Sequence, residues 1–510
     1  MPTEVELKLR VAPEHVAKLQ RHPLLKTLCR ARPVRQKLYT VYYDTPDLDL
    51  FKHGSSLRLR RAGSRWLQTV KSDETARGGL YQRSEWESPV ARQEPDFAAL
   101  QGLALPRFFA SSKLRRTLQP VFVTEFTRST RLLQATPGEE VEFCLDRGEI
   151  RAKAAASPIC EIELELKSGS PARLFEMALE LQKIIPLKLE NDSKALRGYR
   201  LYNGEAPAPA KAAAPSLTRS MNASDAFIAI VGGCVQHLQA NEAGMLEQGD
   251  PEYLHQMRVA LRRMRSAFNV FSKILPEPVT IPLVEEIKWL GGELGPARDW
   301  DVFYYETLLP VMEVFAEDPA LRALREECLK LREASRAAGR QAVDSPRYQR
   351  WLLLLGAFLI RRPWFNEKAG SAPLIATLPV AEFAQALLEK CQRRLIKLGR
   401  HLARLNERER HRLRIAAKKL RYTADFFSGL YLRKRARRYL KALGSLQDIL
   451  GLLNDAATMR KLLDELGRCR PESQSAVNLI SGWNAHTVRQ QLQEMRPAWE
   501  ECISVKAFWR

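Results

Sequence analysis

Apolar and charged residues alternate along several segments of the first two hundred residues. The first of these segments is Glu4-Val5-Glu6-Leu7-Lys8. Successive side chains of a β-strand point to opposite faces, so a strand here would place Glu4, Glu6 and Lys8 together, opposite Val5 and Leu7. A single strand of this kind is typical of a sheet edge with a solvated charged face. The repetition of the pattern in later segments favours a different explanation.

The later strand-like segments are short, rich in β-branched and aromatic residues, and separated by glycine, proline and serine. After Gly54, apolar and basic residues alternate and place Arg58 and Arg60 on one face. The segment Asp146-Arg147-Gly148-Glu149 is expected to form a hairpin turn between two strands. Strands are predicted at residues 38–44, 57–61, 66–71, 81–87, 120–133, 139–145, 150–153 and 159–167, and a helix at 171–185.

The last of these strands carries Glu161, Glu163, Glu165 and Lys167 on one face. In an open sheet the charged faces would be wet, whereas in a closed antiparallel sheet they could line a tunnel while the apolar faces pack on outer helices. Carboxylates bind hard divalent cations, and Arg and Lys neutralise phosphate oxygens. Rows of acidic and basic side chains therefore suit a metal-bound polyphosphate, although the residue pattern alone supports the open sheet and the tunnel equally.

The pattern changes after a connector rich in proline and alanine at residues 203–217. From residue 218 to 510, apolar residues recur at helical spacing in long stretches rich in Leu, Ala and Arg. The longest apolar run, residues 351–360, is too short to span a bilayer and ends in two arginines. We therefore predict one domain at residues 1–202, a linker at 203–217 and an all-α domain at 218–510.

The helical region contains an internal repeat. The motif that begins at His255 returns at His411, 156 residues later (the difference between 411 and 255), with every basic position at the same spacing. Asp299 and Asp455 continue the match at the same separation. On a helix, the basic residues of each copy lie three or four apart and form one stripe opposite an apolar side. The repeat predicts two equivalent halves, whose facing stripes would form one basic groove.

The charge balance narrows the range of partners. The chain has 510 residues with 81 Lys and Arg against 59 Asp and Glu, a formal net charge of +22. Such an excess favours an anionic partner: nucleic acid, an acidic membrane or a phosphate polymer. Nucleic acid is disfavoured, because no aromatic platform accompanies the basic helices. The eight scattered cysteines lack metal-ligand spacing and are typical of reduced thiols, so we expect a soluble cytoplasmic protein without a membrane partner.

The charged residues of the first domain occur in an order that resembles the CYTH family of triphosphate tunnel metalloenzymes. The shared pattern starts with Glu4, Glu6 and Lys8 and ends with Ser193 and Lys194. The resemblance implies an eight-stranded antiparallel tunnel that binds a triphosphate group together with Mg²⁺ or Mn²⁺. Members of the family include inorganic, thiamine and RNA triphosphatases and class IV adenylate cyclases.

The resemblance also implies roles for individual residues. The catalytic set would be Glu4, Glu6, Lys8 and Asp146. The metal ligands would come from Glu4, Glu6, Asp146, Glu161, Glu163 and Glu165, and which of the last three bind the metal directly stays open. The phosphate groups would be bound by Lys8, Arg58, Arg60, Lys71, Arg83, Arg128 and Lys194. Glu85 is expected to pair with neighbouring basic residues, and Arg131 and Glu87 to be structural.

The repeated helical region resembles the CHAD domain, an α-helical module named for its conserved histidines, across residues 218–510. That family implies paired helical bundles with a basic surface that binds inorganic polyphosphate. The residues that would bind it are His255, Arg258, Arg262, Arg263, Arg265, His411, Arg414, Lys418, Lys419 and Arg421. The two histidines could equally donate to phosphate or pack between helices, and Asp299 and Asp455 are expected to orient basic side chains rather than bind metal.

The two domains in this order resemble bacterial CYTH–CHAD inorganic triphosphatases. The resemblance implies metal-dependent hydrolysis of tripolyphosphate to pyrophosphate and phosphate in the tunnel, with polyphosphate bound by the helical domain. A cyclase, or a nucleoside or thiamine triphosphatase, is the nearest alternative because the tunnel residues are shared. A non-catalytic polyphosphate-binding protein is the second. The helical domain could feed substrate to the tunnel or tether the protein to polyphosphate granules.

Overall fold

The structure is a computed structural model that describes residues 3–63, 65–77, 80–98, 109, 111–136, 138–204, 207–365 and 374–510. The chain divides into two compact units. The first comprises Met1–Ala208 together with Pro346–Arg361, and the second comprises Pro209–Ser345 together with Arg362–Arg510. The units are therefore not two continuous segments of sequence, because one helix from the helical region belongs to the first unit.

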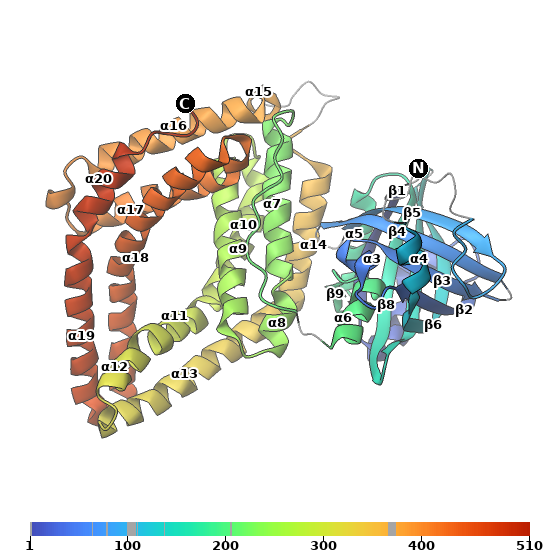
Figure 1. Cartoon of the computed structure of the whole chain (residues 1–510), viewed down its shortest axis with the longest axis horizontal. Helices are drawn as coiled ribbons and strands as arrows, with labels where there is room; N and C mark the ends of the chain where they lie inside the picture. Colours follow the sequence, from blue (N-terminus) through green and yellow to red (C-terminus); the bar gives the residue numbers. More distant parts are fainter. Residues whose placement is uncertain are drawn as a thin grey trace. The chain divides into compact units, whose positions relative to one another are not determined.

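The first unit is built on an antiparallel sheet with the strand order β5-β4-β3-β2-β6-β7-β8-β1-β9 (Figure 1). Because β1 also pairs with β5, eight long strands close into a ring, and the three-residue β9 pairs with the remaining part of β1. The predicted eight-stranded antiparallel tunnel is thus confirmed, with a short ninth strand added. The strands are β1 (Thr3–Val11), β2 (Val34–Asp44), β3 (Ser56–Ala62), β4 (Arg65–Arg77), β5 (Leu80–Val90), β6 (Gln119–Thr136), β7 (Glu139–Ala152), β8 (Ala155–Ser168) and β9 (Leu187–Leu189).

Apolar side chains cover the outer face of the ring. Leu57, Leu59 and Val70 are fully buried in a cluster that includes Leu50 of α3 and Leu114 of α4. The apolar positions of the alternating segments therefore form the outer core, as the period of two predicts. The helices of this unit are α1 (Val16–Gln20), α2 (Pro23–Leu28), α3 (Asp49–Lys52), α4 (Ser112–Thr117), α5 (Ala172–Gln182), α6 (Lys194–Asn203) and α14 (Pro346–Arg361).

Helix α6 packs closely against the sheet beside the lumen. Its Tyr199 is buried edge-to-face against Phe122 of β6, with ring centroids 5.1 Å apart. Gly198 approaches the same ring so closely that a Cβ atom would lie 2.1 Å from it, and only glycine fits there. This packing fixes the start of the helix, so that its first residue, Lys194, lies in the wall of the central cavity.

The hairpin turn predicted at residues 146–149 is wrong, because β7 runs without a break over Glu139–Ala152. The turn follows at Lys153, which has a positive φ of 53°. A Cβ atom on Gly148 would come within 2.1 Å of the Glu125 carbonyl oxygen on β6. The glycine therefore permits the close approach of two strand backbones rather than a turn.

The second unit consists of helices, which confirms the predicted all-α class of this region. The 37-residue helix α18 packs against α17 and α19 (Figure 1). Within the described residues, none of the helices combines the length and the apolarity needed to cross a membrane. The main helices are α7 (Ala223–Gln239), α8 (Glu242–Glu247), α9 (Pro251–Val270), α10 (Glu277–Glu293), α11 (Gly295–Phe303), α12 (Leu309–Val314), α13 (Pro319–Asp344), α15 (Leu374–Thr377), α16 (Val380–Gly399), α17 (Glu407–Phe427), α18 (Arg433–Cys469), α19 (Gln474–Gln493) and α20 (Met495–Ser504).

The two halves of this unit are related as the repeat predicts. Arg263 Nη1 of α9 lies 3.9 Å from Asp425 Oδ2 of α17, and Lys419 Nζ of α17 donates to Asn269 Oδ1 of α9 at 2.6 Å. In the repeat, Arg263 is equivalent to Lys419 and Asn269 is equivalent to Asp425. Reciprocal contacts between equivalent positions are the property of a twofold arrangement. The helical region is therefore a pair of pseudo-symmetric bundles.

Replacing Gly148 by alanine is expected to lower the free energy of unfolding by about 1–3 kcal/mol, because the added methyl group collides with the backbone of β6. Denaturant unfolding of the full chain measures the loss. Gly233→Ala is the control, because this exposed position in α7 has nothing within 4 Å of its added Cβ atom. The control should raise the free energy of unfolding by about 0.5–1 kcal/mol. Equal effects of the two substitutions would contradict the steric explanation.

Candidate active site

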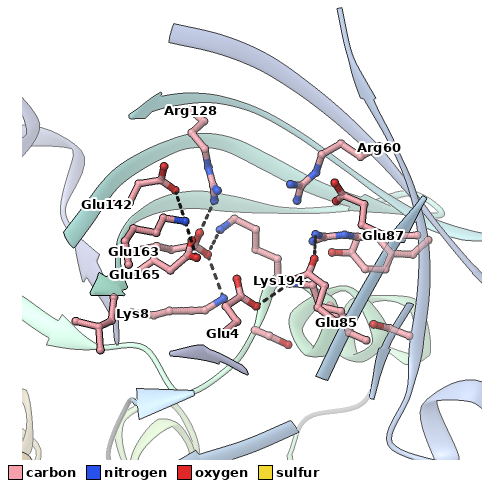
Figure 2. Close-up of a pocket in the computed structure, with 18 residues that line it drawn as sticks. Glu4, Lys8, Arg60, Glu85, Glu87, Arg128, Glu142, Glu163, Glu165 and Lys194 are labelled. Carbon is pink, nitrogen blue, oxygen red and sulfur yellow. Dashed lines mark hydrogen bonds and ion pairs between the residues drawn. The ribbon is translucent and has the colours of Figure 1, made fainter. Parts of the chain in front are cut away.

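A cavity of about 800 Å³ is enclosed by the strands of the ring and the start of α6, and most of its lining is charged (Figure 2). Figure 2 shows Arg60, Arg128 and Lys194 pointing into the same space. The basic lining residues are Lys8, Arg58, Arg60, Lys71, Arg128, Lys167 and Lys194. The acidic lining residues are Glu4, Glu85, Glu87, Glu142, Glu163 and Glu165. The charged strand faces thus point inward.

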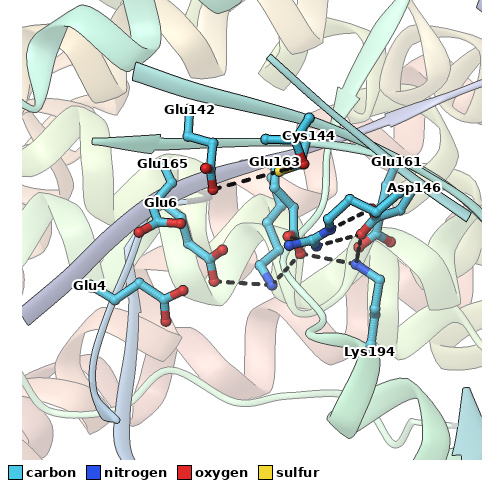
Figure 3. A network of polar contacts seen from close by, with 12 residues as sticks. Glu4, Glu6, Glu142, Cys144, Asp146, Glu161, Glu163, Glu165 and Lys194 are labelled. Carbon is cyan, nitrogen blue, oxygen red and sulfur yellow. Dashed lines mark hydrogen bonds and ion pairs between the residues drawn. The ribbon is translucent and has the colours of Figure 1, made fainter. Parts of the chain in front are cut away.

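Strand register gathers four glutamates on one side of the cavity. Glu6 of β1 lies opposite Glu165 of β8, and Glu165 lies opposite Glu142 of β7. Glu4 lies two residues earlier on β1 and therefore on the same face (Figure 3). We call these four residues the carboxylate row. Lys167 Nζ lies 2.6 Å from Glu165 Oε1 and 3.5 Å from Glu142 Oε1, and burial raises the pKa of Glu165.

A second group of carboxylates surrounds a buried lysine. Lys194 Nζ lies 2.8 Å from Asp146 Oδ2 and 2.9 Å from Glu163 Oε1, and it also pairs with Glu161. Arg128 donates to both oxygens of Asp146, at 2.8 and 2.7 Å, and pairs with Glu163. Oxygens of the three carboxylates lie within 4.8 Å of one another, a spacing that could surround a metal ion. In this ion cluster, however, the ammonium group of Lys194 pairs with all three carboxylates (Figure 3).

Electrostatic interactions keep the ion cluster charged. Burial disfavours the ammonium form of Lys194, but the carboxylates of Asp146, Glu161 and Glu163 outweigh burial and raise the pKa of this lysine. Burial likewise opposes ionisation of Glu163, yet the neighbouring cations, of which Lys194 is the strongest, lower its pKa well below the usual range. Lys194 and Glu163 therefore remain ionised at neutral pH.

The charged residues of β1 form ion pairs within the strand and with other strands of the ring. Lys8 Nζ lies 3.1 Å from Glu6 Oε1 and 3.0 Å from Glu163 Oε1. Lys71 Nζ of β4 lies 3.2 Å from Glu4 Oε2. Glu4 and Lys8 are thus each in contact with a predicted residue from a distant segment, which the closed sheet brings close, whereas Glu6 pairs with Lys8 of its own strand.

Arg60 differs from the other basic residues of the cavity. Glu85 pairs with Lys71 at 2.9 Å and with Arg58 at 3.2 Å, as the sequence analysis expects. Arg60 Nε donates only weakly, to Thr40 Oγ1 at 3.4 Å, and no carboxylate among the described residues pairs with it. Burial and two neighbouring guanidinium groups, first that of Arg58, lower the pKa of Arg60 to about 10. The side chain is still charged at neutral pH and lies beside like charges.

Three further predicted residues have different surroundings. Arg83 lies opposite Glu4 in strand register, but its side chain falls outside the described part of the structure. Arg131 donates to the Gln20 carbonyl oxygen at 3.3 Å and does not line the cavity. Glu87, which the sequence analysis treats as structural, does line the cavity.

Sequence reasoning misses Glu142, and it places Lys167 on the charged face without giving it a role, yet both residues line the cavity. The signal for Glu142 is the run Glu142-Phe143-Cys144-Leu145-Asp146, in which every second residue faces inward. A turn expected at Asp146 hides this alternation, because it ends the strand too early. Lys167 continues the alternation of Glu161, Glu163 and Glu165, and its position in that run is the available signal.

In the second unit, the basic stripes of α9 and α17 approach each other. Burial, and then the charges of Arg414 and Arg262, lower the pKa of Lys418 to about 8, so cations of the two halves act on one another. Asp299 also interacts with Asp455 of the other half. The ten predicted residues differ in exposure: Arg262, Arg265 and His411 are exposed, and the others are half-buried, namely His255, Arg258, Arg263, Arg414, Lys418, Lys419 and Arg421. Arg263 and Lys419 contact the opposite half, as described above.

Both regions of the chain match known protein families. Residues 2–199 match the CYTH domain family and residues 229–464 match the CHAD domain family. The chain therefore carries a CYTH domain followed by a CHAD domain, which confirms both resemblances noted from the sequence.

Individual relatives agree with this assignment. An inorganic triphosphatase of Haemophilus influenzae is 34% identical over 204 residues, which cover 39% of this chain and 55% of that protein. The match thus spans about half the length of that curated relative. A solved CHAD domain from the plant Ricinus communis is 35% identical, with a TM-score of 0.52, over 59% of this chain and 99% of that chain.

Replacing Lys194 by methionine is expected to lower the free energy of unfolding by about 3–5 kcal/mol, because three buried carboxylates lose their shared cation. Denaturant unfolding measures the change. Lys183→Met is the matched control, since its ion pair with Glu180 is exposed and should contribute less than about 1 kcal/mol. Adding Asp146→Asn to Lys194→Met should recover part of the lost free energy of unfolding. If the losses of the two substitutions simply added, Lys194 and Asp146 would not stabilise each other in the ion cluster.

Proposed function

We propose that the first unit hydrolyses inorganic tripolyphosphate to pyrophosphate and phosphate. The observation that carries the proposal is the guanidinium group of Arg60, which lies beside Arg58 and Arg128 in the cavity and has no carboxylate partner in the described part of the chain. A group of cations in which one lacks a counter-ion favours an anionic ligand with several oxygens. The similarity to a protein named inorganic triphosphatase supports the same conclusion.

The carboxylate row fits a hard divalent cation such as Mg²⁺ or Mn²⁺, because its ligands are all oxygens. The candidate ligands are Glu4, Glu6, Glu142 and Glu165. The carboxylates of the ion cluster share two buried cations, Lys194 and Arg128, whereas in the row Glu142 and Glu165 share one partly exposed lysine, Lys167. A metal site at the carboxylate row would narrow the ligand set that the family resemblance implies and would add Glu142 to it. When bound, such a cation polarises phosphate oxygens and lowers the pKa of water.

The chain's own cations bind the substrate and stabilise the reaction. Arg58 and Arg60 present N–H donors to the phosphate oxygens. The oxygen of a water molecule attacks the terminal phosphorus, and the bond from that phosphorus to the bridging oxygen breaks. Pyrophosphate leaves with the electron pair, and the proton of the water passes to solvent. Lys8 binds the phosphate chain in the ground state and in the transition state alike, and Lys71 stabilises the charge that develops on the leaving group.

Asp146 has a different role in this proposal from the one that the family resemblance suggests. Its carboxylate is fully buried and is bonded to Arg128 and Lys194. It is therefore a positioning residue, which holds two substrate-binding cations in place. Together with Arg58 and Arg60, these cations form the basic part of the cavity lining.

An inorganic substrate is favoured over a nucleotide or thiamine triphosphate. Among the described residues that line the cavity, Tyr42 is the only aromatic side chain, and it packs against Phe122 with ring centroids 4.4 Å apart. A bound base or thiazole ring would need an apolar or stacking surface. The cavity offers charge instead, so the triphosphate group itself is the part that it can recognise.

The second unit binds inorganic polyphosphate in the same proposal. The stripes of α9 and α17 bring Arg262 and Lys418 within reach of one another's charge, although like charges repel. A polyanion that bridges the two stripes would relieve this repulsion. The partner is therefore a flexible chain of phosphate groups, and the binding surface lies across the pseudo-twofold axis.

The double substitution Glu4→Gln/Glu6→Gln should reduce metal-dependent phosphate release from tripolyphosphate by more than about a hundredfold, because it removes two anionic ligands of the cation. Phosphate release from tripolyphosphate, ATP and long-chain polyphosphate, each with Mg²⁺ or Mn²⁺, is the measurement. Glu149→Gln, a half-exposed position on β7, is the control and should keep wild-type activity. A wild-type protein that releases no phosphate from any of the three would refute the enzyme assignment.

The double substitution Arg262→Gln/Lys418→Gln should weaken polyphosphate binding about tenfold or more, and reduce the slope of log affinity against log salt by about two. Titration calorimetry at several salt concentrations measures both quantities. Arg322→Gln/Lys330→Gln on α13 removes the same charge outside the stripes and serves as the control. Equal losses in the two double variants would show that net charge alone attracts polyphosphate.

A further inference from the structure

Helix α14 lies within the sequence that matches the CHAD family, yet it belongs to the first unit. It packs against α5 and against the short strand β9. Its buried residues include Gln349, a polar side chain with only 1% of its surface exposed. A buried amide side chain in an otherwise apolar face needs hydrogen-bonding partners, and these partners show what the helix supports.

The packing of α14 on α5 fixes the position of the helix. A Cβ atom on Gly356 would lie 2.2 Å from the ring of Phe175, which is fully buried. At the end of α14, Arg361 pairs with Glu176, the neighbour of Phe175 on α5. Gln349 lies two helical turns before Gly356 and therefore on the same face. The contact between Gly356 and Phe175 thus fixes the position from which the amide group of Gln349 can form hydrogen bonds.

Gln349 holds the outer edge of β9. Its Oε1 atom accepts a hydrogen bond from the backbone N–H of Leu189 at 2.9 Å. Successive N–H groups of a strand point to opposite edges, and the next one, on Glu190, donates to the carbonyl oxygen of Lys8 on β1 at 2.9 Å. Gln349 therefore takes the place that a neighbouring strand would have beside β9.

The strand held in this way connects two lysines of the cavity. On one side, Leu189 pairs in register with Leu9, the neighbour of Lys8. On the other side, the chain runs from Glu190 to Lys194, and the buried Glu190 carboxylate lies 3.2 Å from Arg10 Nε. A shift of β9 would therefore move the backbone at Lys8 and the start of α6 at Lys194.

We propose that Gln349 is a positioning residue of the cavity, through which the helical sequence sets the affinity of the tunnel for phosphate chains. It touches no substrate and acts through Leu189 and Glu190 on the ammonium groups of Lys8 and Lys194. These groups contact phosphate in the ground state and in the transition state alike, so their displacement raises KM more than it lowers kcat. The kinetic part of this inference rests on the proposed function, and the structural part does not.

The test uses the full chain with Gln349→Leu, which removes the acceptor with little change in volume. Amide hydrogen exchange in the segment 187–194 should accelerate about tenfold, the factor expected for loss of one buried hydrogen bond. The Kd for tripolyphosphate, measured by calorimetry, and the KM should rise by about the same factor, with kcat changed less than about threefold. Gln349→Glu keeps an oxygen acceptor and should restore slow exchange.

Leu354→Ala is the matched control, because Leu354 lies on the exposed face of α14 and should leave exchange and KM unchanged. If Gln349→Leu does not fold, Gln349→Asn keeps a buried amide but is too short to reach Leu189, and the same changes are expected. Wild-type exchange and KM in a folded variant would overturn the proposal. If the wild-type protein neither binds nor hydrolyses tripolyphosphate, the proposed function fails, while the exchange measurement still decides the role of Gln349.

Discussion

The ammonium group of Lys194, bonded to three buried carboxylates, is the interaction on which the cavity depends. A sheet that closes with its charged faces inward removes those charges from water, and such a structure is stable only if nearly every charge finds a partner. Asp146 and Glu161 come from neighbouring strands, and Lys194 comes from the helix that follows β9. The ion cluster therefore ties α6 to β7 and β8, and the packing of Gly198 against Phe122 makes that geometry possible.

Two places in the cavity are less tightly paired than the ion cluster, and these are the places where function is expected. Arg60 lies among guanidinium groups without a carboxylate, and on the opposite side the carboxylate row is joined by Lys167, a partly exposed lysine. A triphosphate bound to a divalent cation would satisfy both, because it brings anionic oxygens to one side and a cation to the other. The same closed sheet thus explains how its inward-facing charges stabilise one another and why the cavity would bind a ligand that carries both signs of charge.

In the second unit, an internal repeat brings two stripes of basic residues together. Each half places its basic stripe on a helix whose other side is apolar, and Met257, Leu261 and Met264 of α9 are all buried. Reciprocal contacts between α9 and α17 hold the two stripes together, although their charges repel. One helix of this region, α14, is packed in the first unit instead. The unit built around the CYTH domain therefore includes a helix from the sequence that matches the CHAD family.

The sequence by itself determined the fold class, the inward-facing charges and the repeat. Alternation along β1 and β8 identifies the charged faces, because a strand offers only two faces, and the constant separation of His255 and His411 identifies the two halves. The prediction from sequence was wrong at residues 146–149, where Gly148 permits two strands to approach closely and does not form a turn. Because the predicted strand ended too early, Glu142 was not recognised as a cavity residue. Only the tertiary structure decided which carboxylates surround Lys194 and that Gln349 contacts β9. These pairings join residues far apart in the chain, and such contacts depend on register and packing, which leave no local pattern in the sequence.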